Sequence, residues 1–317
     1  MEIFVTVGLF LVGALLIIKG GDVFIDAAGW VSDVSGISKA VIGATIVSFA
    51  TTAPEYFVSL LATLKGYTDL SVGNAVGSLI CNIGIAFALL AMCTPGKVHD
   101  KLFGVKGLTM LGATVLLLIS CLNGAVSVVE GLLLIAVFAF FTIVNIRFSK
   151  DGEEKAERRP TNRREIVINI VKFVGGAAAI IIGSDFIVDS GRDIAARIGI
   201  SETVIGLTVI AIGTALPEIV TSVAAIIKKQ NALSLGNIIG ANILDATLIL
   251  ATGAFVSGGG LTVPASTTTI DLPFLIMIMA IAVLPTFFKK KVYRAQGALI
   301  ASCYVLYLIY IIAASLS

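Results

Sequence analysis

Long apolar stretches alternate along the chain with short breaks of polar residues and glycine. A helix needs about 20 mostly apolar residues to cross the hydrocarbon core of a bilayer, and the stretches are of that order of length. The sequence predicts ten such helices, at residues 3–19, 39–66, 70–92, 105–123, 127–147, 166–188, 202–229, 233–255, 269–288 and 295–315. The first has Glu2 where a signal peptide carries basic residues, so we interpret it as a membrane helix.

The composition supports a membrane protein and narrows the classes of function. Of the 317 residues, 57% are hydrophobic and 13% charged, about half the charged share of an average soluble domain, which excludes a soluble enzyme. The net charge of +2 indicates no nucleic-acid partner. Four scattered cysteines and one histidine, His99, suggest neither a disulfide frame nor histidine catalysis. We expect no enzyme activity, no cofactor and no obligate protein partner, with the lipid bilayer and small cations as partners.

The distribution of Lys and Arg predicts the orientation of the helices. Of the 22 Lys and Arg residues, 17 fall in the loops on one side of the predicted membrane and 3 on the other. Basic residues favour the cytoplasmic side, so both termini are expected outside, in the plasma membrane of a prokaryote. The charged segment 148–165 would be a cytoplasmic loop between two five-helix halves, 1–147 and 166–317.

The two halves contain an internal repeat. Residues 20–88 align without a gap onto 183–251 at a constant offset of 163, with 23 identical pairs. The identities include Pro, Glu, Asn and Gly at fixed positions, which a shared apolar composition does not explain. Because each half has an odd number of helices, the second copy must lie inverted in the membrane. Many secondary transporters have this architecture, with broken helices and a binding site near the midplane.

Three carboxylates lie near the middle of predicted helices. Glu55 and Glu218 are near the midpoints of 39–66 and 202–229, while Asp245 and its repeat partner Asn82 are near those of 233–255 and 70–92. A charge at the bilayer centre costs at least about 2.5 kcal/mol on insertion scales. No Lys or Arg lies at that depth, so a bound cation or a proton must compensate these acids.

The neighbouring residues favour a hard metal cation. Ser48, Thr51, Thr52 and Glu55 share one helix face, as do Ser78 and Asn82 on the next helix. Oxygen ligands without thiolate or imidazole suit Ca²⁺ or Na⁺ and argue against zinc or copper. Pro54 and Pro217 precede the two glutamates, and each removes a backbone donor, so we expect broken helices that expose carbonyl oxygens there.

These motifs resemble the cation/calcium exchanger superfamily, and within it the prokaryotic sodium/calcium exchangers. The first copy reads ATTAPE at 50–55 and GNAVGSLICN at 73–82; the second reads GTALPE at 213–218 and GNIIGANILD at 236–245. The resemblance implies an all-α membrane protein of ten helices in two inverted five-helix repeats. It also implies a secondary antiporter that exchanges Na⁺ for Ca²⁺ by alternating access at a midplane carboxylate site.

The resemblance also implies site residues. The Ca²⁺ ligands would be Thr51, Glu55, Thr214 and Glu218. The Na⁺ ligands would include Thr52, Ser78 and the carbonyls of Ser48 and Ala211, together with Glu55, Thr214, Glu218, Asn82 and Asp245. Two alanines, Ala215 and Ala241, stand where the family has hydroxyl residues. We expect them to weaken one outward Na⁺ sub-site.

Several alternatives remain open. The missing hydroxyls favour a Ca²⁺/H⁺ antiporter of the same fold, which would need only two carboxylates. A passive cation channel would show flux without any dependence on a counter-ion. An intramembrane hydrolase has little support, because the sequence has no GxGD or HExxH motif and no Ser/His pair. Asp245 raises the question of K⁺ dependence, since K⁺-dependent relatives have an acid at the matching place.

Overall fold

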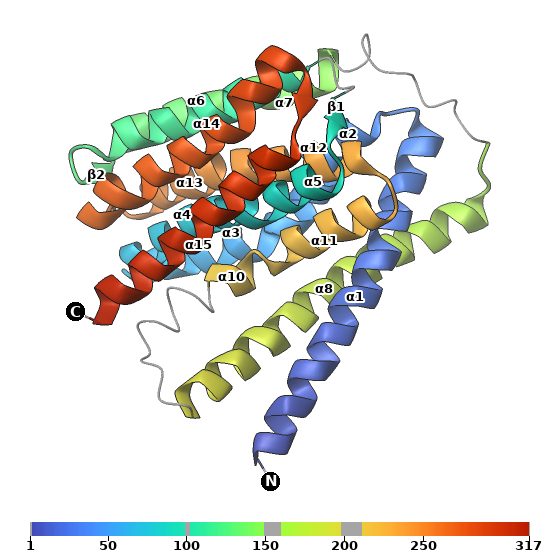
Figure 1. Ribbon diagram of the computed structural model, residues 1–317, viewed down its shortest axis with the longest axis horizontal. Helices are drawn as coiled ribbons and strands as arrows, with labels where there is room; N and C mark the ends of the chain where they lie inside the picture. The colour runs from blue at the N-terminus through green and yellow to red at the C-terminus, as the bar shows by residue number, and fades with distance from the viewer. Residues whose placement is uncertain (1, 99–101, 149–159, 198–210, 317) are drawn as a thin grey trace.

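The computed structural model describes residues 2–98, 102–148, 160–197 and 211–316 (Figure 1). The first half contains α1 (Glu2–Ser35), α2 (Lys39–Ile42), η1 (Gly43–Val47), α3 (Ser48–Leu64), α4 (Thr68–Cys81), η2 (Asn82–Phe87), α5 (Ala88–Cys93), β1 (Gly96–Lys97), α6 (Phe103–Cys121), β2 (Ala125–Val126) and α7 (Val128–Phe148), where η marks a π-helical segment. The second half contains α8 (Arg163–Arg197), α10 (Ala211–Thr214), α11 (Leu216–Ile227), α12 (Asn231–Ile243), η4 (Leu244–Ile249), α13 (Leu250–Val256), β3 (Leu261–Thr262), η5 (Thr267–Asp271), α14 (Leu272–Lys289), β4 (Lys291–Val292) and α15 (Arg294–Leu316).

Nine of the predicted membrane helices have a counterpart in the described part of the chain, where nine helical stretches are long and apolar enough to cross a bilayer. Several of these stretches join consecutive segments, such as α2, η1 and α3 over Lys39–Leu64. The remaining prediction, 202–229, begins outside the described residues. Its described end contains α10 and the apolar helix α11.

Two helices are much longer than the prediction. α1 has 34 residues where the sequence predicted a helix over 3–19, and α8 has 35 where it predicted 166–188. The prediction for α1 was wrong because Gly20 was taken as a break. The glycine instead permits close packing: a Cβ on Gly20 would come within 2.9 Å of Ala179 Cβ and 3.0 Å of the Gly176 carbonyl oxygen on α8. The two helices run along each other beside the rest of the molecule (Figure 1).

Of the two helix breaks predicted at prolines, the structure shows only the one in the second repeat. Pro54 lies inside α3, which continues to Leu64, so the expected break at Pro54 was wrong. Neighbouring helices and hydroxyl side chains satisfy the backbone around a proline in a packed membrane helix. The irregular segment next to this helix is η1, which precedes α3. In the second repeat the helix does break, at Ala215 (φ −81°, ψ −1°), and Pro217 lies in the first turn of α11, where a missing N–H is tolerated.

The two halves interlock. α3 packs against α12 and η4, and α4 packs against α10, so each half contributes to the centre. Two short antiparallel sheets join loops across the halves: β1 pairs with β4 in the register Gly96–Val292, and β2 pairs with β3 in the register Val126–Leu261. The stretches Thr68–Cys93 and Asn231–Val256 are the most buried, and they form the centre of the molecule. The division into two halves at 148–165 stays a prediction.

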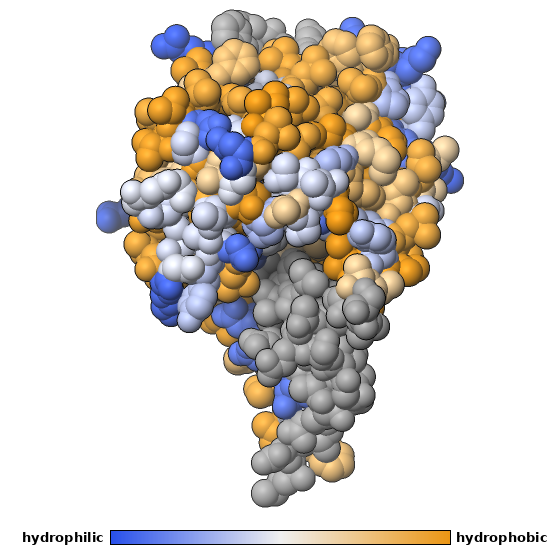
Figure 2. Space-filling model, turned by 90° about the vertical axis from the view of Figure 1, so that its left-hand side faces the viewer, coloured by the Kyte–Doolittle hydropathy of each residue, from blue (hydrophilic) through white to orange (hydrophobic). Residues whose placement is uncertain are grey.

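The outer surface is strongly apolar. Large side chains such as Phe4, Leu15, Ile119, Val171 and Ile309 are mostly exposed. Figure 2 shows broad hydrophobic areas over one face of the molecule, with polar residues gathered in a smaller region. Exposed apolar patches of this extent indicate contact with a nonaqueous phase. The chain is therefore an integral membrane protein whose helical exterior faces lipid.

Candidate cation site between the repeats

The two glutamates at the centre come from opposite repeats and are almost completely buried. Glu55 lies on α3 and Glu218 in the first turn of α11, with exposed fractions of 0% and 2%. Thr52 Oγ1, on α3, donates a hydrogen bond of 2.9 Å to Glu218 Oε1. This bond crosses the boundary between the repeats, so the structure brings the PE motifs of both copies together.

Three of the four glutamate oxygens have no hydrogen-bond partner. These are both carboxylate oxygens of Glu55 and Oε2 of Glu218. A buried polar atom without a partner costs about 1–3 kcal/mol, and more when it is charged. Within the described residues neither glutamate forms an ion pair with Lys or Arg. The two side chains therefore present negative oxygen atoms that only a cation or a proton can compensate.

Two buried hydroxyl residues of the first repeat, Ser48 and Thr51, lie on α3 together with Glu55. Thr51 Oγ1 lies 3.2 Å from the carbonyl oxygens of both Val47 and Ser48, and 3.4 Å from Asn237 Oδ1. Ser48 is fully buried, and its Oγ donates to the Thr45 carbonyl oxygen. The second-repeat counterparts of Ser48 and Thr51 are Ala211 and Thr214, the first and last residues of α10. The side chains of these two residues lie outside the described part of the structure.

A second group of polar side chains lies on the neighbouring helices. Asn82 Nδ2 donates to Asp245 Oδ2 at 3.4 Å, and both residues are 1% exposed. They occupy the first turns of η2 and η4, the matching π-helical segments of the two repeats. Asn82 Oδ1, Asp245 Oδ1 and Ser78 Oγ have no hydrogen-bond partner. The predicted site residues Ser78, Asn82 and Asp245 are therefore buried and keep unpartnered oxygens.

Two asparagines on the polar helix faces of the site were not among the predicted ligands. Asn237 donates to Thr221 Oγ1 at 3.0 Å, while its Oδ1 lies against Thr51 of the other repeat. Asn74 donates to the Glu55 carbonyl oxygen at 3.2 Å and to Ser59 Oγ at 2.9 Å. They are identical residues at the repeat offset, and that signal could have found them. They hold the backbone and hydroxyls around the glutamates.

Asp271 was also missed. It ends η5, is partly buried, and accepts a hydrogen bond of 2.8 Å from Tyr307 on α15. Asp271 lies near the start of the predicted helix 269–288, so it was not among the three acids predicted near the middle of membrane helices. Since its carboxylate is bonded to a tyrosine of a neighbouring helix, it belongs to the packing of α14 against α15 and not to the central site.

Glycines allow the repeats to approach closely around the site. A Cβ on Gly240 would come within 2.5 Å of Ser48 Oγ and 2.7 Å of the Ala44 carbonyl oxygen. A Cβ on Gly236 would overlap the Ala40 carbonyl oxygen, and one on Gly43 would overlap that of Leu233. α12 therefore lies directly against α2 and η1, as expected for a small-residue helix contact.

The donor set indicates which ions the site suits. The described residues contain no group of three His, Cys, Asp or Glu side chains that would hold a metal ion by themselves. Any ion bound between Glu55 and Glu218 must complete its coordination with hydroxyl, amide or carbonyl oxygens. Hard cations such as Ca²⁺ and Na⁺ take such ligands, whereas soft transition metals prefer nitrogen and sulfur.

Comparisons with known proteins show which family the chain belongs to. The family model "Sodium/calcium exchanger protein" matches residues 5–147 and 168–313. The chain is 28% identical over 344 residues to the sodium/calcium exchanger MaX1 of Methanosarcina acetivorans, covering 95% of this chain and 97% of the relative. It is 31% identical over 303 residues to an uncharacterised membrane protein of Methanocaldococcus jannaschii, covering 95% and 96%.

A solved structure agrees over almost the whole chain. The structure of the sodium-calcium exchanger NCX_Mj, soaked with 10 mM Na⁺ and 10 mM Sr²⁺, matches with a TM-score of 0.84 at 29% identity. The match covers 96% of this chain and 97% of that chain. The fold and both repeats with their PE motifs therefore agree with one family, and this chain belongs to the sodium/calcium exchanger protein family.

Proposed function

We propose that this protein is a secondary antiporter that exchanges Na⁺ for Ca²⁺ across the membrane by alternating access. The observation that carries the proposal is the buried pair Glu55 and Glu218, contributed by opposite repeats, with three carboxylate oxygens that have no protein partner. Two carboxylates balance one divalent cation. The family membership and the names of the relatives support the choice of Ca²⁺ and Na⁺.

The proposed ligands follow the sequence prediction. Ca²⁺ binds Glu55 and Glu218 together with the hydroxyls of Thr51 and Thr214. Na⁺ uses the same carboxylates and Thr214, with Thr52, Ser78, Asn82, Asp245 and the carbonyls of Ser48 and Ala211. Because the two ions share Glu55 and Glu218, binding of one excludes the other.

The same carboxylates explain why transport of one ion is coupled to transport of the other. Without a cation, the site would hold negative charges in a water-poor interior, which is unfavourable by several kcal/mol per unpaired charge. The protein therefore rarely closes around the site when no cation is bound, and it closes readily when a cation is bound. This difference prevents a one-way leak and makes transport of one ion depend on return of the other.

The topology proposed for this function places both termini outside, in a prokaryotic plasma membrane. It rests on the 17 to 3 distribution of Lys and Arg between the two sides. In this orientation the Lys228 end of α11 faces the cytoplasm and the Lys65 end of α3 faces the outside. Labelling of single cysteines at these ends with a membrane-impermeant reagent tests the orientation.

A Ca²⁺/H⁺ antiporter is the second candidate, and Ala215 and Ala241 favour it. Both are fully buried and provide no hydroxyl at positions where the first repeat has Thr52 and Ser78. Fewer oxygen ligands favour a proton over Na⁺ as the counter-ion.

Flux measurements in proteoliposomes decide among these functions. We expect uptake of ⁴⁵Ca that requires an outward Na⁺ gradient and falls to background in Glu55→Gln and Glu218→Gln. The matched control is Glu130→Gln. Glu130 Oε2 accepts a hydrogen bond from the backbone N–H of Ser127, and an amide oxygen can replace it. Uptake driven by a pH gradient without Na⁺ would establish the second candidate, and uptake without any counter-ion would establish a channel.

A further inference from the structure

Basic residues gather at the small sheet that β1 and β4 form between two loops far apart in the sequence. Lys97 and Lys291 are directly opposite each other in the antiparallel ladder, next to the pair Gly96–Val292. Successive side chains of a strand point to opposite faces, and Val292 is only 2% exposed, so it points into the protein. Lys97 and Lys291 therefore lie together on the outer face, where both are exposed. Three more exposed basic residues flank this pair, and we call the whole set the basic patch: Lys97, Lys289, Lys290, Lys291 and Arg294.

Hydrogen bonds hold the backbone under the basic patch. The N–H of Val98 donates a 3.0 Å bond to the Lys290 carbonyl oxygen, which extends the ladder by one contact. Lys290 has φ +49°, a left-handed conformation that non-glycine residues adopt rarely, and it ends α14 just before β4. The side chain of Gln296 accepts a 3.2 Å bond from the Tyr293 N–H and donates a 2.7 Å bond to the Ile281 carbonyl oxygen. A ligand of the patch would therefore lose little free energy to ordering the backbone.

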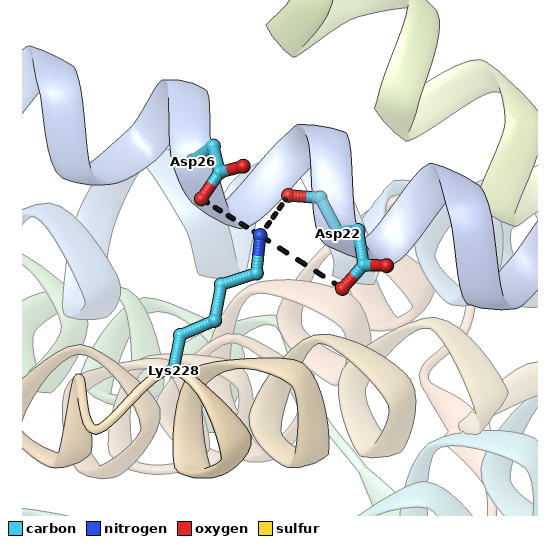
Figure 3. A network of polar contacts seen from close by, with 3 residues as sticks. All are labelled: Asp22, Asp26 and Lys228. Atoms are coloured by element: carbon cyan, nitrogen blue, oxygen red, sulfur yellow. Dashed lines mark hydrogen bonds and ion pairs between the residues drawn. The ribbon is translucent and has the colours of Figure 1, made fainter.

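Within the described chain no carboxylate balances this charge. Like charges directly opposite in an antiparallel ladder are destabilising. Lys228 shows how a lysine at a helix end is otherwise compensated: its Nζ lies 2.7 Å from Asp26 Oδ1, and Figure 3 shows Asp22 beside it. None of the five patch residues forms an ion pair with another described residue. Lys291 Nζ lies 5.2 Å from the centre of the Tyr293 ring, and an exposed cation–π contact contributes little. The patch therefore leaves its charges available to an external anion.

The orientation of the chain in the membrane does not account for this arrangement. Basic residues anywhere in a cytoplasmic loop satisfy the positive-inside preference. The dipole of α14 favours a cation at its C-terminal end, which concerns Lys289 alone. Neither effect gives a reason to place Lys97 across the ladder from Lys291.

Apolar side chains beside the patch indicate that the anion is attached to a lipid. Phe287 and Phe288 lie in the last turn of α14, directly before Lys289, and are 37% and 73% exposed. Their ring centres are 5.2 Å apart. Because α14 leaves the membrane at this end, the two rings lie at the level of the acyl chains and the lysines at the level of the headgroups. A soluble anion would use the lysines and leave the phenylalanines uncovered.

We propose that the basic patch binds the headgroup of an anionic phospholipid. The phosphate lies over Lys97 and Lys291, and an acyl chain covers Phe287 and Phe288. Basic surfaces on the cytoplasmic side of membrane proteins attract anionic headgroups, and the proposed topology places the patch on that side. Since the two lysines come from different loops, a bound lipid strengthens the contact between β1 and β4. The inference does not depend on which ions the protein transports.

Thermal unfolding of the full-length protein in detergent tests the proposal. Phosphatidylglycerol should raise the unfolding midpoint in a saturable way, and phosphatidylcholine should raise it much less at the same concentration. Lys97→Gln with Lys291→Gln should weaken the apparent affinity for phosphatidylglycerol about 25-fold, because each basic residue contributes about fivefold. The matched control, Arg163→Gln with Arg164→Gln, removes two exposed charges at the start of α8 and should keep the wild-type affinity. Lys97→Arg with Lys291→Arg should also keep it, which separates loss of charge from a folding defect.

Charge reversal provides an independent readout. Lys97→Glu places a carboxylate across from Lys291, so the midpoint without lipid should rise while the further rise with phosphatidylglycerol shrinks. Choline chloride should weaken the binding of phosphatidylglycerol, because salt screens exposed charges. Equal effects of the two lipids, or full affinity in Lys97→Gln with Lys291→Gln, would show that the patch does not bind an anionic lipid. An equal rise with inorganic phosphate would assign the patch to a soluble anion and overturn the proposal. None of these measurements uses transport, so they stay valid if the proposed function fails.

Discussion

The hydroxyl of Thr52 on α3 donates a 2.9 Å hydrogen bond to the Glu218 carboxylate on α11. The bond joins a hydroxyl of the first repeat to a buried carboxylate of the second, so neither repeat builds the cation site alone. A cation that binds Glu218 meets a carboxylate already oriented by the opposite repeat. This dependence of one repeat on the other can be tested by substitution.

Replacement of Thr52 by alanine should weaken ion binding. It leaves Glu218 Oε1 buried without its donor, and a hydrogen bond to a charged group contributes about 1.5–3 kcal/mol. Affinity for Ca²⁺ should therefore fall by about one to two orders of magnitude. Thr52→Ser keeps the hydroxyl and should retain most of the affinity. Binding isotherms for both variants check this, and equal loss in the serine variant would contradict it.

Gly236 and its repeat counterpart Gly73 should respond oppositely to alanine. A Cβ on Gly236 would overlap the Ala40 carbonyl oxygen, whereas a Cβ on Gly73 meets nothing within 4 Å. Gly236→Ala should therefore destabilise the protein by about 1–3 kcal/mol through overpacking. Gly73→Ala should be neutral or slightly stabilising, because alanine favours helix. Thermal unfolding in detergent measures both, and equal effects would show that α12 does not need this close approach.

Removal of the Asp245 charge should affect transport differently from removal of a glutamate charge. Its carboxylate contacts the Asn82 amide at 3.4 Å and keeps one oxygen unpartnered. Asp245→Asn resembles the protonated acid, so Na⁺-driven Ca²⁺ uptake should persist while its dependence on pH and on added K⁺ decreases. ⁴⁵Ca flux across a pH series with and without K⁺ tests this. Complete loss of uptake at every pH, as expected for Glu218→Gln, would make Asp245 a Ca²⁺ ligand.

Restoring the missing hydroxyls should increase the use of Na⁺. Ala215 and Ala241 are fully buried and correspond to Thr52 and Ser78 of the first repeat. Ala215→Ser with Ala241→Ser adds two oxygen ligands, so more Na⁺ should move for each Ca²⁺. The reversal potential of Ca²⁺ flux in proteoliposomes should then depend more steeply on the Na⁺ gradient. An unchanged reversal potential would show that these positions do not limit Na⁺ binding.

Local pattern and repeat identity were enough to predict most of the membrane helices and the three buried acids of the centre. Apolar length identifies a helix that crosses a bilayer whatever its neighbours are, and charge at mid-depth is so costly that Glu55, Glu218 and Asp245 pointed to a cation. The same reasoning was wrong where a residue type has two structural uses. Gly20 was taken as a helix end and Pro54 as a break, yet both lie inside continuous helices.

The sequence by itself therefore determined the membrane class, the inverted repeat and the acids that require a counter-ion, because these depend on transfer energies and on identity between positions. Only the tertiary structure decided that Thr52 reaches Glu218 and that Asn237 contacts Thr51. It also decided that Lys228 contacts Asp22 and Asp26 on α1, while its repeat counterpart Lys65 is exposed. The repeat treats both copies alike, so it cannot say which copy makes such a contact. That difference depends on long-range packing, which no local pattern encodes.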